Sequence, residues 1–128
     1  MTRQFVVQLE NRPGALARLA RALADQGIDI RQIAGGGMGS VGYAILETDD
    51  DAATVDVLRN AGHPFVAGEP ILTTIPDVPG ALASTADRLA VAGVDVSGIL
   101  IVGRRHGSVE IALSVDDAAR ARAVLGLG

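Results

Sequence analysis

The chain has no cysteine, tryptophan or lysine, and its 128 residues include only three aromatic side chains, Phe5, Tyr43 and Phe65. The missing cysteines exclude disulfides, thiol catalysis and thiolate metal sites. No run of 18 apolar residues is present, so no membrane-spanning helix is predicted. The N-terminus MTRQFVVQLEN is too short and too polar for a signal peptide, and we expect a cytoplasmic protein. The core must be aliphatic.

Charge of one sign is also scarce. The net charge is −4, and all 11 cations are arginines scattered singly, apart from Arg104-Arg105. A basic patch is lacking, so neither nucleic acid nor a membrane is an expected partner.

Catalytic motifs are lacking as well. His63 and His106 fall in predicted loops, and no nucleophile elbow, His-x-x-x-His pair or phosphate-loop lysine occurs. The three acids Asp49, Asp50 and Asp51 precede a predicted helix and are expected to cap it rather than to bind a cation. We therefore expect no enzyme, no cofactor and no metal site.

An internal repeat organises the chain. Residues 9–33 read LENRPGALARLARALADQGIDIRQI, and residues 75–99, at an offset of 66, read IPDVPGALASTADRLAVAGVDVSGI. Of these 25 aligned positions 11 are identical, and no gap is needed. A repeat of this length indicates two copies of one structural unit.

Each copy has the same local pattern. A strand ends, the chain turns through Asn11 to Gly14 or Asp77 to Gly80, and a helix with apolar residues at helical spacing follows. Proline suits the first turn of a helix, so Pro13 and Pro79 predict helix starts. Asn11 and Asp77 are candidate caps. Glycines at 27 and 93 predict left-handed helix ends before the next strand.

The Asn/Asp-x-Pro-Gly turn, the Ala-Leu helix and the Gly-(Ile/Val)-Asp-(Ile/Val) strand entry together resemble the ACT domain. That resemblance covers nearly the whole chain, as two copies. It implies small regulatory modules that most often bind amino acids, with a ferredoxin-like βαββαβ order. The expected fold class is α+β, with antiparallel sheets and helices on one face.

The expected domains are residues 1–68 and 69–128, with Gly68 to Pro70 as the linker. The second copy ends before its last strand, which leaves the edge of residues 71–75 unpaired. The run of glycines from Gly35 to Ser40 is expected to be a flexible hairpin connection. The expected strands are 3–9, 28–34, 41–48, 64–67, 70–76, 94–102 and 107–115, and the expected helices are 13–25, 51–61, 79–91 and 117–125.

The turn between first strand and first helix is the best candidate site. Gly14 admits a ligand close to the backbone, and N–H groups of Gly14, Ala15 and Leu16 at a helix start suit a carboxylate. The resemblance implies that second-strand residues of a neighbouring domain complete the site. The candidate ligand-binding residues are Asn11, Pro13, Gly14, Ala15, Leu16, Ile30, Gln32, Ile33, Asp77, Gly80, Ala81, Val96, Ser97 and Ile99.

The first copy is the better candidate of the two. The Asn11 amide can donate to a ligand carboxylate, whereas an ionised Asp77 would repel it. The apolar strand residues favour an amino acid with a small or aliphatic side chain. In either copy the alternative interpretation is a helix cap with packing and no ligand.

Two functions from different classes remain open. The chain is either a stand-alone amino-acid sensor that signals to a partner, or a non-catalytic assembly module such as a regulatory subunit or an ACT-only repressor. Its opening also resembles that of acetolactate synthase regulatory subunits, although those continue into a different C-terminal domain. Domains of about 60 residues are marginal alone. We expect a homodimer, with Val6 and Ile33 as candidate residues of a buried face.

Overall fold

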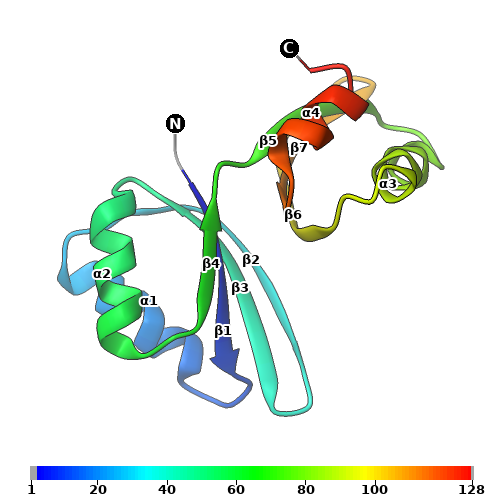
Figure 1. Ribbon diagram of the computed structural model, residues 1–128. Helices are drawn as coiled ribbons and strands as arrows, with labels where there is room; N and C mark the ends of the chain where they lie inside the picture. Colours follow the sequence, from blue (N-terminus) through cyan, green and yellow to red (C-terminus); the bar gives the residue numbers. More distant parts are fainter. Residues whose placement is uncertain (1–2, 128) are drawn as a thin grey trace. The chain divides into compact units, whose positions relative to one another are not determined.

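The computed structural model describes residues 3–127, and the chain divides into two compact units at the boundary between Gly68 and Glu69 (Figure 1). Residues 1, 2 and 128 of the expected domains lie outside the described part. Each unit is described by itself below.

The first unit has the order of a ferredoxin-like fold, and its four-stranded antiparallel sheet runs β2-β3-β1-β4. Its elements are β1 (Gln4–Glu10), α1 (Ala15–Asp25), β2 (Ile30–Met38), β3 (Val41–Thr48), α2 (Asp51–Ala61) and β4 (Phe65–Gly68).

The second unit repeats this order without a fourth strand, and its three-stranded antiparallel sheet runs β5-β7-β6. Its elements are β5 (Ile71–Pro76), α3 (Ala81–Val91), β6 (Val96–Arg105), β7 (Ser108–Val115) and α4 (Ala118–Val124). Up to residue 127 no strand follows α4, and β5 pairs with β7 alone among the described strands. The α+β class, the two antiparallel sheets and the missing last strand are thus confirmed.

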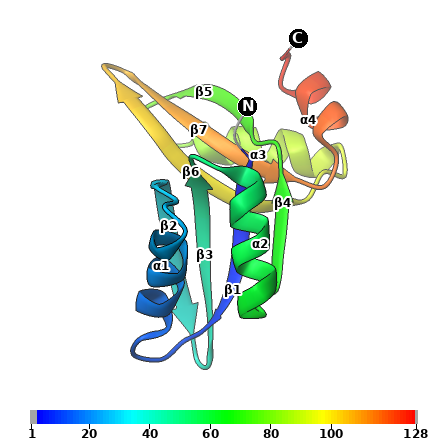
Figure 2. The same cartoon turned by 90° about the vertical axis from the view of Figure 1, so that its left-hand side faces the viewer.

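The helices cover one face of each sheet, as α1 and α2 do in Figure 2. Alternation along β1 turns Phe5, Val7 and Leu9 toward the helices, where all three are buried against Leu19 and Leu23 of α1. The second core is built the same way from aliphatic side chains of β5, β7, α3, α4 and the connection between α3 and β6: Ile71, Leu89, Val94, Val109, Ile111, Leu113 and Ala121. Each unit therefore has its own core.

The helix starts differ from expectation. Helices α1 and α3 begin at Ala15 and Ala81, two residues after the prolines, and the N-caps are Gly14 and Gly80 at φ 89° and 87°. No side-chain cap bond is made at either start, so the prediction that Asn11 and Asp77 cap these helices is wrong. The positive φ is what requires glycine at these two turns.

The other helix ends follow the sequence. Asp50 accepts a hydrogen bond from the Ala53 N–H at 3.0 Å, and Asp117 does the same for Arg120. Both aspartates are the N-caps of their helices, α2 and α4. Gly27 and Gly93 are left-handed just beyond α1 and α3, as predicted.

The glycine run was wrongly predicted. Gly35, Gly36 and Gly37 lie within β2 and pair with β3, and the hairpin turn is confined to Gly39-Ser40. In the second unit the turn is His106-Gly107, after a longer strand β6. Strand β6 is longer than β2 because it carries an additional residue, in a bulge between Ile101 and Gly103. Beyond the bulge the two units correspond at an offset of 67 rather than 66.

Candidate functional site

A hollow of about 390 Å³ lies in the first unit between the start of α1 and the edge strand β2, and we call it the Asn11 hollow. Its rim carries the polar groups Glu10, Asn11 and Arg12 from the end of β1 and the turn that follows. Its other lining residues are Leu9, Ala15, Leu16, Ile33, Ala34, Gly35, Gly36, Gly42, Tyr43 and Ala44. Apolar walls with a few polar groups at one end are typical of small-molecule sites.

Small residues on two paired strands keep the Asn11 hollow open. Gly35 pairs with Ala44, and Gly37 pairs with Gly42, so all four positions share the helix-facing side with Ile33. In the second unit the matching pairs are Ile101 with Ile111, and Arg104 with Val109. The second unit therefore has larger side chains at all four strand positions where the first unit has glycine or alanine.

Asn11 joins the turn to the tip of the hairpin. Its backbone N–H donates to the Ser40 carbonyl at 2.9 Å, and its side-chain Nδ2 donates to the Gly39 carbonyl at 2.9 Å. In the second unit Asp77 keeps the backbone bond, to Gly107, but its carboxylate pairs with Arg104 at 3.1 Å. Asp77 is thereby occupied by a partner from its own unit.

Glu10 and Arg12 form an ion pair at 2.5 Å on the rim, and both side chains are more than half exposed. Such a pair contributes little to stability. It does place one carboxylate and one guanidinium side by side, which is the charge pattern that complements a zwitterion. Neither Glu10 nor Arg12 was predicted as a site residue from the sequence. The signal that could have identified them is the difference between the copies, because the matching residues of the second copy are Pro76 and Val78.

The predicted residues of the first copy are only partly brought together. Asn11, Ala15, Leu16 and Ile33 line the hollow, whereas Pro13, Gly14, Ile30 and Gln32 are not among its lining residues. The Ala15 N–H is not free for a ligand, because it donates to the Arg12 carbonyl at 3.2 Å. That leaves the N–H groups of Gly14 and Leu16 as the predicted backbone donors.

The predicted residues of the second copy are spread out. Gly80 and Ala81 lie by a hollow at the start of α3, of about 430 Å³. Ser97 on β6 donates from its hydroxyl to the Ser114 carbonyl at 3.2 Å. Val96 and Ile99 are partly exposed on the same strand. The polar side chains that line the hollow at Gly80 are the hydroxyls of Thr73, Thr74, Ser84 and Thr85 and the guanidinium of Arg88.

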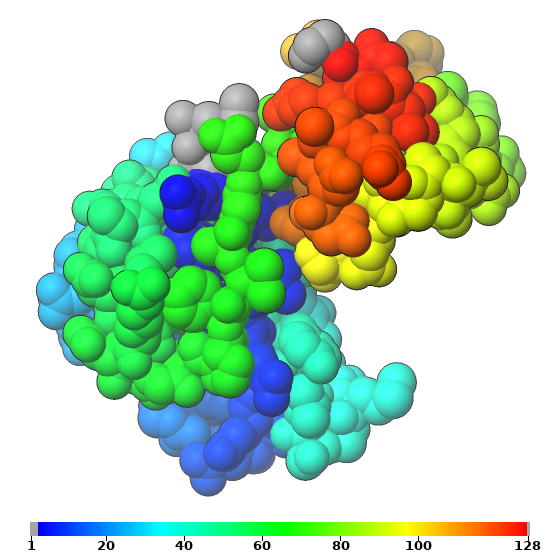
Figure 3. Space-filling model, in the orientation of Figure 1, coloured from blue at the N-terminus to red at the C-terminus, as the bar shows by residue number. Residues whose placement is uncertain are grey.

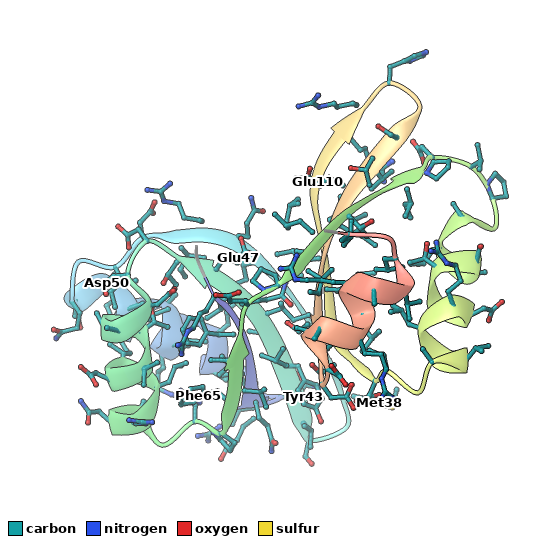
Figure 4. All side chains as sticks on the ribbon, turned by 45° about the horizontal axis from the view of Figure 1, so that its top comes forward. Met38, Tyr43, Glu47, Asp50, Phe65 and Glu110 are labelled. Carbon is teal, nitrogen blue, oxygen red and sulfur yellow. The ribbon has the colours of Figure 1, made fainter. Side chains whose placement is uncertain are left out.

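Figure 4 places the labelled side chains of the first unit. Tyr43 and Met38 lie on the β2–β3 hairpin, Asp50 at the start of α2, and Glu47 on β3 just before it. The hairpin tip projects from the unit in the space-filling view (Figure 3), and Met38 there is 88% exposed. Both histidines lie in loops, as predicted.

Among residues 3–127, no helix is long and apolar enough to cross a membrane. No group of three or more histidine, aspartate or glutamate side chains in that range is placed to hold a metal ion.

The ACT domain family model matches residues 3–62, which are most of the first unit. No curated protein sequence matches the chain.

Solved structures resemble the whole chain. A protein of Bacteroides thetaiotaomicron is 20% identical with a TM-score of 0.71, over 98% of this chain and 88% of its own. The ligand-free regulatory subunit of aspartate kinase from Thermus thermophilus is 20% identical with a TM-score of 0.64, over 98% of this chain and 89% of its own. At this identity the likeness shows the fold. The sequence similarity to the ACT domain covers residues 3–62.

Proposed function

We propose that the chain is a non-catalytic regulatory protein built of two ACT domains, residues 1–68 and 69–128, and that the first binds a free amino acid in the Asn11 hollow. The observation that carries this proposal is the contrast between the two units. Both have the same fold, yet only the first has small residues at the strand positions that line the hollow. A fold requirement would apply to both units.

The chemistry of the hollow suits a zwitterion with an apolar side chain. The guanidinium of Arg12, the second N–H of the Asn11 amide and the N–H group of Leu16 are donors for the carboxylate. The carboxylate of Glu10 is the acceptor for the ammonium group. The aliphatic side chain then lies against Leu16, Ile33 and Ala44, which favours a small or branched apolar amino acid.

The test is a thermal-shift panel of the common amino acids on the full chain. Stabilisation grows as RT ln(1 + [L]/Kd), so ligand at 100 times Kd should contribute about 2.7 kcal/mol. A shift by aliphatic amino acids supports the sensor. If no amino acid at millimolar concentration shifts the melting temperature, the sensor is rejected.

Gly42→Val is the discriminating variant, because it installs in the first unit the residue that the second has at the matching position, Val109. A Cβ at Gly42 meets no atom closer than 3.6 Å, which is ordinary van der Waals contact. Gly68→Val, on β4 and away from the hollow, is the matched control, since a Cβ there meets nothing within 4 Å. The amino-acid response should be lost only in Gly42→Val.

A second candidate function, an assembly module that acts through protein contacts, is favoured by exposed apolar residues. Leu16 and Ile33 are 53% and 47% exposed in the first unit, and their repeat partners Leu82 and Ile99 are 49% and 39% exposed in the second. Ile33 lies on the edge strand β2, and Leu16 of α1 lines the same hollow as Ile33. We propose that these four exposed apolar side chains are covered in a homodimer.

Light scattering at micromolar concentration tests the dimer, and Leu82→Glu, distant in sequence from the Asn11 hollow, tests the apolar surface. A monomeric wild type contradicts the dimer. Co-purification of a single enzyme with a chain that shows no amino-acid response would favour the regulatory subunit over the sensor.

A further inference from the structure

A second hollow of about 440 Å³ opens at the other side of the β1–α1 turn, and we call it the Arg18 hollow. Its charged lining residues are Glu10, Arg12, Arg18 and His63, brought together from β1, the turn, α1 and the loop after α2. The remaining lining residues are Gln8, Leu9, Ala15, Ser40, Val41, Ala61, Gly62 and Pro64. Two guanidinium groups and an imidazole therefore face one cavity with a single carboxylate.

The cations are available for a ligand. Among residues 3–127, no carboxylate lies within ion-pair distance of Arg18, and its guanidinium lies near Gly14, where a Cβ would be 3.4 Å from its Nη1. Arg12 has only the exposed pair with Glu10, which is weak enough for the guanidinium to turn to a stronger partner. His63 is half-buried at the rim.

The second unit shows that the fold does not need these cations. Its counterpart is the hollow at Gly80, which is lined by the matching residues Thr74, Ile75, Val78, Ala81 and Ser84. Val78 and Ser84 stand where Arg12 and Arg18 stand in the first unit. A hollow of nearly the same volume thus forms at this place in both copies. The first is lined by Arg12 and Arg18, whereas the arginine of the second is Arg88, whose guanidinium donates to the Val124 carbonyl at 2.6 Å.

A simpler role for these side chains would be to interact with the partial negative charge at the C-terminal end of α2. The last turn of α2 is already satisfied by its own backbone, because Gly62 N–H donates to Arg59 and His63 N–H to Leu58, with Gly62 left-handed at φ 76°. The helix end therefore does not account for two guanidinium groups and an imidazole on one cavity.

We propose that the Arg18 hollow binds a phosphate group, either inorganic phosphate or the phosphate of a small monoester. A phosphate monoester carries about −1.5 to −2 charge at pH 7 and three acceptor oxygens. Guanidinium groups recognise it in bidentate geometry. Arg12 and Arg18 supply these forks, and His63 adds a third donor from the opposite element. The two hollows share Glu10 and Arg12, but the phosphate proposal does not require an amino acid to bind, since Arg18 and His63 do not line the Asn11 hollow.

Calorimetric titration of the full chain with inorganic phosphate and with glycerol 3-phosphate tests the proposal, with chloride at equal ionic strength as the blank. Saturable binding with one site per chain is expected. Tighter binding of the ester would identify a monoester as the source, and equal or tighter binding of inorganic phosphate would identify the free ion.

Arg18→Gln and His63→Gln should each weaken binding about tenfold or more, because each removes a charge-assisted hydrogen bond. The matched controls are Arg21→Gln, one turn further along the exposed side of α1, and His106→Gln in the other loop; both should bind like wild type. Gly42→Val should also retain phosphate binding, whatever it does to amino acids. No saturable binding, or equal losses in Arg18→Gln and Arg21→Gln, would overturn the proposal.

Discussion

The side-chain nitrogen of Asn11 donates to the carbonyl oxygen of Gly39 at 2.9 Å and so ties the β1–α1 turn to the hairpin tip. The Asn11 side chain lies against Gly37, where a Cβ would come within 2.7 to 2.9 Å of three of its atoms. The Asn11 side chain therefore links the β1–α1 turn to the β2–β3 hairpin. Gly37, which has no side chain, leaves the space that the Asn11 side chain occupies.

Gly37→Ala is expected to displace Asn11 and break this hydrogen bond, which should lower the free energy of unfolding by about 1 kcal/mol. In an Asn11→Ala background the clash is gone, and the same substitution should be neutral or slightly stabilising, because glycine weakens a strand. Urea denaturation of the four variants measures the coupling. Gly36→Ala is the control, since its Cβ meets nothing within 4 Å. If Gly37→Ala lowers the free energy of unfolding equally in both backgrounds, the proposed coupling between Gly37 and Asn11 is contradicted.

Asp50→Ala should destabilise the first unit by about 0.5–2 kcal/mol, because it removes the side-chain acceptor for the Ala53 N–H at the start of α2. Asp56→Ala, at an exposed interior position of the same helix, should change stability by less than about 0.7 kcal/mol and in the stabilising direction. Thermal denaturation of both variants checks the difference. A cost at Asp56 as large as that at Asp50 would mean that lost charge, and not the cap, is responsible.

Burial on β3 raises the pKa of Glu47 above its ordinary value of 4.5, and the charge of Asp51 raises it further. Between the ordinary and the raised pKa the folded chain holds a proton that the unfolded chain releases, so the free energy of unfolding falls as the pH rises through that window. Glu47→Gln should therefore be more stable than wild type at pH 7. The difference should vanish as the pH is lowered below the ordinary pKa.

Urea denaturation at a series of pH values measures the Glu47 effect. Glu69→Gln, at an exposed position, controls for the loss of one negative charge. A gain at pH 7 that persists unchanged at low pH would show that desolvation of the Glu47 carboxylate is not its source.

Leu89→Ala should lower the stability of the second unit by about 2–5 kcal/mol, since the Leu89 side chain is 2% exposed in the core and its removal leaves a cavity. Val91→Ala, two residues on in the same helix, is the control, because Val91 is 91% exposed. Hydrogen exchange of the α3 amides should report the loss in the first variant and not in the second.

The fold could be predicted from the sequence because its signals are local and occur twice. The apolar spacing of residues 15–25 and 81–91, the glycines at 27 and 93, and the acids at 50 and 117 each specify an element boundary through backbone chemistry. The repeat then supplied the topology, including the missing last strand.

The candidate site was less predictable because it depends on pairing between strands. Gly35 pairs with Ala44 and Gly37 pairs with Gly42. This register could not be predicted from the sequence, because a run of glycines is typical of a loop and gives no sign of where the strand ends. Asn11 was assigned a capping role from its distance to the helix, whereas its partner Gly39 lies 28 residues away in sequence. Glu10 and Arg12 form an ion pair that no motif marks.

The bulge in β6 distinguishes the second hairpin from the first. The extra residue offsets β7 and the cap of α4 by one position relative to the first unit, while the hairpin turn and the Asp117 cap are retained. Beyond the bulge Arg104 stands at the position that matches Gly37, and it forms an ion pair with Asp77. The two hairpins thus differ in length by one residue, and the longer one supplies a side-chain partner to its turn where the shorter one supplies only backbone.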